Sequence, residues 1–306
     1  MIPLAAVIGA ATAVGVVADR RRHLAADRLA RRLMDGLLWV LLPIVAFVNM
    51  AALELTPQVG AGIGFAYVGL AVTLALAWAL GTHVLNLSRP AVGALMVSAG
   101  LANTGYLGLP FTAALLGFDA LPEAVAYDAV VSGIALVTAG FSVGAAFGTA
   151  GDRPRERIRA FLLRNPALWA TAAGLVAPAA LAPGWAVDAS RGLVLLAVPI
   201  GFFAVGVALA GEGFVRRSMG GLRGTLDRAV AVAIALKLVV PPAIVLGLSA
   251  FLIDVPDAYL VQAAMPTAVN TLVVCHAYGL DRRIAAAAIA WTTTIVVCVG
   301  VVAALV

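Results

Sequence analysis

Charged residues are scarce in this chain, and their scarcity excludes an ordinary soluble domain. Asp, Glu, Lys and Arg make up 11% of the 306 residues, whereas 63% are hydrophobic. A soluble domain carries about 25% charged residues, because its surface needs them even when its core is large. Fifteen acids and twenty bases could not cover a soluble protein of this length. The composition therefore predicts a protein whose outer surface faces lipid.

Lysine and cysteine are almost absent, and the exceptions are informative. Lys237 is the only lysine, and it lies within an apolar stretch. Cys275 and Cys298 lie in different apolar stretches, so they predict neither a disulfide framework nor a metal site. No Gly-Lys phosphate-binding motif suggests ATP-driven transport, and we expect no cofactor. Nucleic acid is not an expected partner either, because the basic residues lie in short segments between the apolar stretches.

Ten apolar stretches match the length of about 17–25 residues that a transmembrane helix needs. The expected fold class is therefore an all-α membrane protein with ten transmembrane helices. The first stretch lacks a basic start and a clear cleavage site, so we do not expect a removable signal peptide. The stretches cover roughly residues 2–18, 36–53, 60–80, 90–117, 123–149, 165–182, 190–211, 229–252, 257–278 and 284–306.

Arginine positions predict the orientation of these helices. If ten spans are threaded in order, 18 arginines fall on one side and only Arg191 falls on the other. Cytoplasmic loops carry an excess of basic residues, so both termini are expected outside the cytoplasm. The Arg-rich segment 20–32 is then expected to be a cytoplasmic loop close to anionic lipid headgroups.

The fourth and ninth stretches are interrupted where a membrane helix would be expected to run unbroken. The interruptions are Ala-Asn-Thr-Gly-Tyr-Leu-Gly-Leu-Pro at 102–110 and Met-Pro-Thr-Ala-Val-Asn at 265–270. Proline removes a backbone donor and glycine weakens a helix. Unwound backbone at bilayer depth is tolerated only inside protein or beside a polar cavity. Paired broken helices therefore indicate the binding site of a secondary transporter.

One sequence offset relates the two halves of the chain. Pro110 and Pro266 are 266 − 110 = 156 positions apart, and Pro43 and Pro199 have the same separation. We therefore expect two five-helix repeats, at residues 1–150 and 151–306, joined by a loop around 152–164. Because five is odd, the second repeat would have inverted orientation.

The interrupted segments closely resemble the two crossover motifs of the auxin efflux carrier family. The first is Asn103-x-Gly105-x-x-Gly108-x-Pro110, and the second is the Met-Pro-Thr-Ala-x-Asn run at 265–270. Lys237 followed by a Pro-Pro pair also resembles the family pattern. The resemblance implies carriage of organic anions and a fold similar to bile-acid symporters and sodium/proton antiporters. It also implies a scaffold of spans one, two, six and seven, and a moving transport domain of spans three to five and eight to ten.

The resemblance and the local chemistry together suggest candidate substrate-binding residues at the breaks. An amide offers both donors and an acceptor, and half-helix N-termini carry partial positive charge, so these segments suit a carboxylate. Alternatively, each asparagine caps a half-helix. Asn49 interrupts the apolar second span and either faces the substrate or bonds a neighbouring helix. The candidates are Asn103, Thr104, Gly105, Pro110, Pro266, Thr267, Asn270 and Asn49.

Lys237 and Asp128 are the candidates for charge compensation or coupling. A charged side chain within a membrane span costs free energy, so it usually indicates a function. Alternatively, Lys237 forms a structural pair with a distant acid or with carbonyl groups at a break. Span three holds no acid that could partner it. Asp128 is the nearest membrane acid, but a place in the outer headgroup region is the favoured interpretation. No metal site is expected.

We therefore expect a secondary or facilitative carrier for a small organic anion, auxin-like or a mono- or dicarboxylate, in a prokaryotic cell membrane. The carrier would work by elevator-type alternating access. The alternatives are a sodium- or proton-coupled symporter of the same fold, an intramembrane enzyme and a non-transporting receptor. Scattered acids argue against an enzyme. The expected partners are the anion and the lipid bilayer, with a homodimer as an open alternative to a monomer.

Overall fold

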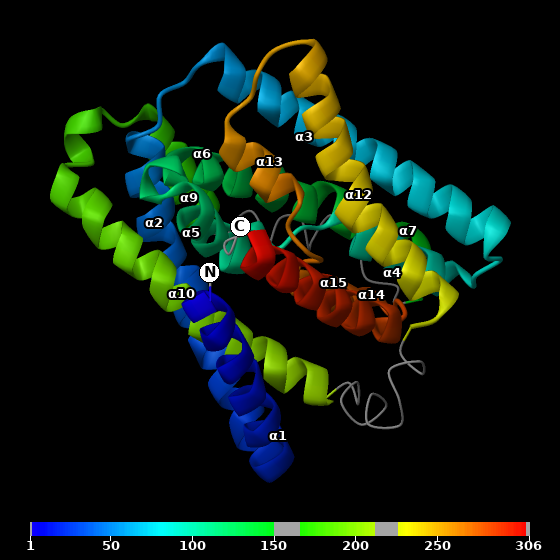
Figure 1. Cartoon of the computed structure of the whole chain (residues 1–306). Helices are drawn as coiled ribbons and strands as arrows, with labels where there is room; N and C mark the ends of the chain where they lie inside the picture. The colour runs from blue at the N-terminus through cyan, green and yellow to red at the C-terminus, as the bar shows by residue number, and fades with distance from the viewer. Residues whose placement is uncertain (1, 150–165, 212–225, 304–306) are drawn as a thin grey trace.

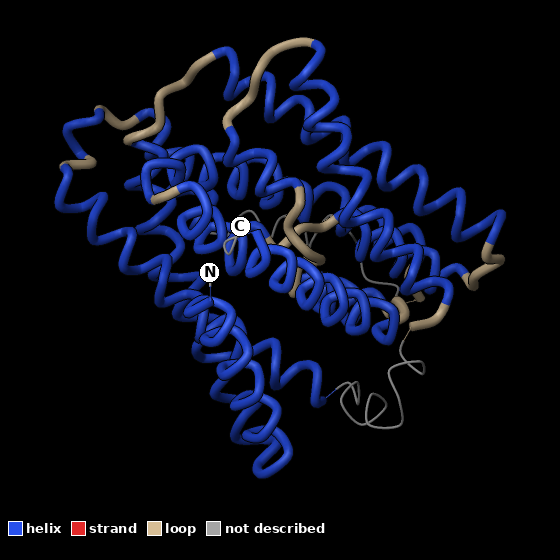
Figure 2. The backbone as a smooth tube through the Cα atoms, viewed as in Figure 1, coloured by secondary structure: helices blue, strands red, loops and turns tan. Residues whose placement is uncertain are grey.

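The computed structural model describes residues 2–149, 166–211 and 226–303, and these residues are almost entirely helical (Figures 1 and 2). The α-helices are α1 (Ile2–Gly36), α2 (Leu42–Ala51), α3 (Pro57–Ala79), α4 (Arg89–Gly100), α5 (Leu109–Leu116), α6 (Leu121–Ala126), α7 (Phe141–Phe147), α9 (Pro166–Val176), α10 (Gly184–Gly211), α12 (Arg228–Phe251), α13 (Asp257–Ala263), α14 (Asn270–Tyr278) and α15 (Arg282–Ala303). Short π and 3-10 turns extend them at η1 (Leu37–Leu41), η2 (Leu80–Val84), η3 (Thr104–Gly108), η4 (Phe118–Ala120), η5 (Tyr127–Gly133), η6 (Leu136–Gly140) and η7 (Ala179–Leu181).

Six helical stretches of the described chain are long and apolar enough to cross a membrane. They are Ala6–Ala51, Pro57–Val84, Phe118–Phe147, Gly184–Val207, Arg228–Phe251 and Arg282–Ala303. The all-helical membrane class predicted from composition is thus confirmed. These stretches coincide with predicted spans one and two together, three, five, seven, eight and ten. Predicted spans four and nine are broken helices, and predicted span six corresponds to the 11-residue α9.

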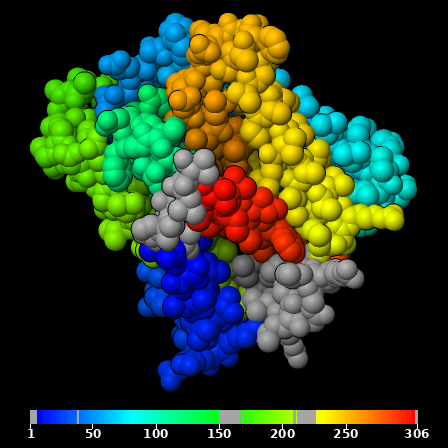
Figure 3. Space-filling model, viewed as in Figure 1, coloured from blue at the N-terminus to red at the C-terminus, as the bar shows by residue number. Residues whose placement is uncertain are grey.

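The stretch Ala6–Ala51 consists of two helices that fold back on each other. A straight helix of its 46 residues would be about 70 Å long, more than twice the hydrocarbon thickness of about 30 Å. Arg22 leaves the helical region, with φ −148° and ψ 68°. Figure 1 shows α1 running down from the N-terminus and returning toward α2, and Figure 3 shows this segment projecting from the body of the molecule.

The predicted loop at 20–32 is therefore wrong, because this segment is helical on both sides of Arg22. Its composition explains the difference. Arginine, alanine and leucine are all strong helix formers, so helix propensity carries the chain through a region that charge alone marks as a loop.

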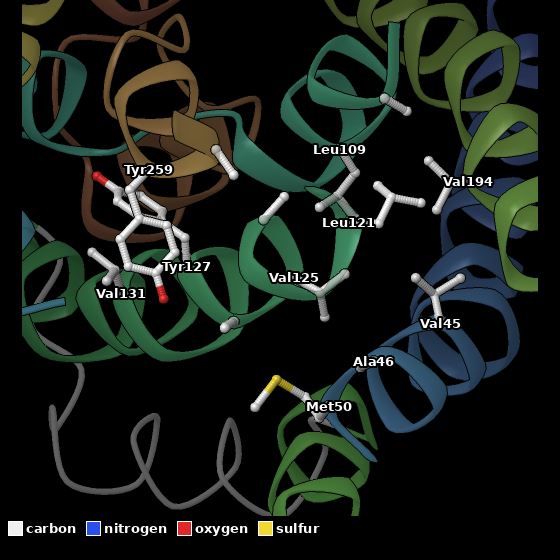
Figure 4. Packing of buried hydrophobic residues seen from close by; sticks show 14 of the residues in the cluster. Val45, Ala46, Met50, Leu109, Leu121, Val125, Tyr127, Val131, Val194 and Tyr259 are labelled. Carbon is white, nitrogen blue, oxygen red and sulfur yellow. The ribbon is translucent and has the colours of Figure 1, made fainter. Parts of the chain in front are cut away.

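The helices pack in two groups. Helices α1, α2, α9 and α10 contact one another, and helices α3, α4, α7, α12, α14 and α15 contact one another. Helices α5, α6 and α13 lie between the groups. Figure 4 shows the contact between these helices and the first group. Leu121 and Val125 of α6 face Val45 of α2 and Val194 of α10. This contact is thus formed by buried apolar side chains.

Backbones of α1 and α10 approach each other closely at two glycines. A Cβ atom on Gly15 would collide with the backbone oxygen of Phe203, and one on Gly206 would collide with the backbone oxygen of Thr12. Small residues that allow such approach are typical of helix contacts in membranes. Helix α1 is therefore held to α10 by backbone contact.

The variant Gly206→Val should destabilise the protein, because overpacking of this kind costs about 1–3 kcal/mol. The measurement is the thermal unfolding midpoint of the purified protein in detergent, which should fall by several degrees. Gly192→Val is the matched control, since it lies in the same helix and a Cβ atom there meets nothing within 4 Å. An equal fall in both variants would assign the effect to helix propensity instead of packing.

Arginines gather at one end of the described helices. The starts of α4, α12 and α15 meet there, because Asp281 N–H donates to Pro90 O (3.3 Å) and Arg283 pairs with Asp227 (2.8 Å). Arg191 instead pairs with Asp188 and Asp119, each at 2.9 Å. The arginines between 153 and 164 and between 216 and 223 lie outside the described residues.

Candidate functional site

The two predicted breaks lie side by side in the centre of the fold. Helix α4 ends at Gly100 and α13 ends at Ala263, and helical structure resumes at Thr104 and Asn270. Between these ends, Ala102 and Thr267 form an isolated antiparallel bridge. Figure 2 shows the two non-helical segments in the interior. The breaks therefore meet, although they are far apart in the sequence.

Peptide groups freed by the breaks are satisfied by one another. Asn103 N–H donates to Pro266 O (2.8 Å), and Ala268 N–H donates to Leu101 O (3.0 Å). Thr267 adds two bonds: its N–H donates to Thr292 Oγ1 (3.1 Å), and its hydroxyl donates to Ser98 O (2.8 Å). Unwound backbone in a membrane needs such internal partners. This pairing explains how both interruptions are tolerated.

The constant offset of 156 does not align the breaks. Pro110 lies in the first turn of α5, after the first break, whereas Pro266 lies inside the second break. Asn103 immediately precedes η3 and Asn270 is the first residue of α14. Both asparagines thus lie on the C-terminal side of their breaks. Pro110 is tolerated at a helix start, whereas Pro266 lies inside a break. In the sequence, both look like the same interruption of an apolar stretch.

A cavity of about 390 Å³ opens at the paired breaks. Its volume falls in the range typical of small-molecule sites. Both packing groups contribute to its walls: α2 and α9 supply Val45, Ala46 and Thr171, and α3 and α12 supply Ala66 and Lys237. The polar or charged side chains among its lining residues include Asn103, Thr104, Asp128, Ser132, Lys237 and Asn270.

Asn103 and Asn270 line the cavity without capping the half-helices that follow them. Neither η3 nor α14 has a side-chain hydrogen bond at its N-cap, and no described residue bonds either amide side chain. Asn103 is nevertheless buried, with 4% of its surface exposed. The capping alternative is therefore wrong for both residues, and their amides are available to a bound molecule.

Asp128 lies in the cavity wall beside the first break, whereas its expected place in the outer headgroup region stays a prediction. Its carboxylate accepts a hydrogen bond from the Thr104 hydroxyl. A Cβ atom on Gly105 would be 3.2 Å from both carboxylate oxygens, so the missing side chain makes room for Asp128. The π-helical turn η5 that carries it is a distortion often found at functional sites.

Lys237 reaches the same cavity from the middle of α12. It is 1% exposed, and no described residue forms a hydrogen bond or ion pair with its ammonium. Lys237 and Asp128 line the same cavity, yet no ion pair within 4 Å joins them. The structural pair considered from the sequence is thus not formed with any described residue.

Four of the predicted substrate-binding residues do not line the cavity. Pro110 and Pro266 shape the backbone, and Thr267 joins the second break to α4, as described above. Asn49 is fully buried, and its amide donates to Val45 O (2.9 Å) and to Ser190 Oγ of α10 (3.1 Å). The alternative that Asn49 bonds a neighbouring helix is the one observed.

Two polar lining residues, Ser132 and Thr171, were missed by sequence analysis. Ser132 follows Asp128 by four positions, so helical spacing places both on one face and gives a usable signal. Thr171 lies in α9, which the sequence shows only as an apolar helix without a distinctive motif. Its role as a wall residue depends on the packing of α9 against α2.

Comparison with known proteins identifies the class of this chain. Residues 162–302 match the model of a family described as membrane transport protein. An uncharacterized transporter of Methanocaldococcus jannaschii is 27% identical over 229 residues, which cover 72% of this chain and 70% of that protein. These similarities agree with the motifs at the two breaks. The chain is therefore an integral membrane transporter, and the resemblance of its two breaks to the crossover motifs of the auxin efflux carrier family fits this class.

Proposed function

We propose that the protein carries a small organic anion, an auxin-like acid or a mono- or dicarboxylate, across the membrane. One observation supports this most: the cavity at the paired breaks collects Asn103, Asn270 and Lys237. Two half-helices begin at this cavity, and helix N-termini favour negative charge. The amides supply directed donors, and the buried amine supplies a positive charge that a carboxylate can neutralise.

The movement we propose is elevator-type alternating access. Ten spans would form two inverted five-helix repeats, 1–150 and 151–306, with the broken helices as crossovers. Helices α1, α2, α9 and α10 would be the scaffold, and the remaining helices the transport domain. The two packing groups support this division, as does a cavity whose walls come from both.

The end of the molecule rich in arginine would face the cytoplasm, following the positive-inside rule. The termini would then lie outside the cytoplasm, in a prokaryotic cell membrane. We further propose that transport does not require sodium. Hard cations prefer several oxygen ligands, and Asp128 is the one carboxylate among the described lining residues, whereas the positive charge is supplied by Lys237.

Uptake into proteoliposomes tests this proposal. Purified protein would be assayed with a panel of labelled mono- and dicarboxylates, in sodium and in choline at constant pH, beside protein-free liposomes. We expect saturable uptake of at least one carboxylate at equal rates in both salts. Uptake of none of them would contradict the carrier function. Uptake lost in choline and restored by millimolar sodium would favour the sodium-coupled symporter.

A further inference from the structure

A carboxylate of the protein lies inside the cavity that is proposed to receive a carboxylate. Asp128 lines the cavity beside Thr104 and Gly105. A simple anion bound between the asparagines would share this desolvated space with a second negative charge, and like charges in such a space repel strongly. The lining is therefore poorly matched to a ligand that carries negative charge alone.

The same cavity holds a positive group, and the two charges do not neutralise each other directly. No ion pair within 4 Å joins Lys237 to Asp128, and no described residue bonds the Lys237 ammonium. Among the described residues, the Thr104 hydroxyl is the side-chain donor to Asp128, which leaves acceptor sites on the carboxylate. The cavity thus contains the Lys237 ammonium, which has no partner among the described residues, and the Asp128 carboxylate, which can accept further hydrogen bonds.

We propose that the substrate is dipolar: a carboxylate that also carries an ammonium group, as in an α-amino acid. Its carboxylate would bind Lys237 and the break asparagines, and its ammonium would bind Asp128. This inference rests on the proposed function and narrows its substrate class. Such a ligand satisfies both charges at once, and complementary charge is a main source of specificity.

Apolar residues around the charges fit the side chain of such a molecule. Val125, Val131, Leu136 and Val273 line the cavity together with Leu70. A volume of about 390 Å³ exceeds what the charged groups of an amino acid occupy, since a water molecule takes about 30 Å³ in the liquid. We therefore expect amino acids with apolar side chains to bind better than glycine.

Pairs of ligands that differ only in the ammonium group test the inference. L-leucine is compared with 4-methylpentanoate, and L-phenylalanine with 3-phenylpropanoate, by calorimetric binding to the full-length protein and by proteoliposome uptake. We expect each amino acid to bind at least about tenfold more tightly than its partner, as one charged hydrogen bond allows. Equal or tighter binding of the acids without the ammonium group would overturn the inference.

Variants of Asp128 test whether this residue causes the preference for ligands with an ammonium group. Asp128→Asn should bring the affinity ratio close to one by weakening amino-acid binding, whereas Asp128→Glu should retain the preference. Asp257→Asn, which removes an exposed carboxylate at the start of α13, is the control and should leave the ratio unchanged. An unchanged ratio in Asp128→Asn would contradict the proposed contact. The wild-type pairs decide the preference even if that variant fails to fold.

The two proposals fail in different ways. Binding and uptake of the simple acids without the amino acids would leave the carrier function intact and exclude the dipolar substrate. Binding of neither class, together with no uptake from the wider carboxylate panel, would contradict the carrier function and this inference with it.

Discussion

Replacing Lys237 by glutamine is expected to reduce carrier-mediated uptake about thirtyfold or more. Loss of one partner from a desolvated charge contact costs about 2–5 kcal/mol, and each 1.4 kcal/mol corresponds to about a factor of ten. Among the described residues that line the cavity, Lys237 is the only one with a positive charge. Lys237→Arg should retain part of the uptake, because it keeps the charge but changes its shape and donor geometry.

Stability distinguishes a transport role of Lys237 from a structural role. A buried ammonium without a protein partner among the described residues destabilises the fold, so Lys237→Gln should unfold at an equal or higher temperature than the wild type. Arg228→Gln, an exposed change at the start of the same helix, should retain both uptake and stability. If Lys237→Gln lost uptake together with a large fall in its unfolding temperature, the residue would be structural.

Local features of the sequence predicted the helical membrane class and the positions of the two breaks. Apolar stretches alternate with arginine clusters along the chain, and this pattern is visible in the order of the residues alone. The two breaks follow from proline and glycine in otherwise apolar segments. A lone lysine among apolar residues, Lys237, stands out for the same reason. These signals need no knowledge of which helices are neighbours.

Features that depend on packing could not be predicted. Asp128 lies near the end of a predicted span, and hydropathy alone does not show that its helix turns this face toward Thr104. Asn49 interrupts an apolar span just as a site residue would, but its partner Ser190 lies 141 positions away. In each case, the deciding contact comes from a distant part of the chain.

Asn103→Ala and Asn270→Ala should each weaken carboxylate binding by about one to two decades. Removing a hydrogen-bond partner from a buried polar group costs about 1–3 kcal/mol, and neither amide has a bond to a described residue that would be lost as well. The measurement is the dissociation constant of a transported carboxylate for the purified variants. Normal affinity in both variants would remove the asparagines from the binding site.

The double variant shows whether both amides hold the same ligand. If they bind one carboxylate, the loss in Asn103→Ala/Asn270→Ala should be smaller than the sum of the single losses, because residues that share a partner are not additive. Asn49→Ala is the matched control: its amide bonds Ser190 between α2 and α10, so the change should lower the unfolding temperature and leave affinity intact. The asparagines at the breaks should show the opposite pattern. Additive losses would instead assign Asn103 and Asn270 to separate parts of the ligand, and a shared carboxylate site would then be wrong.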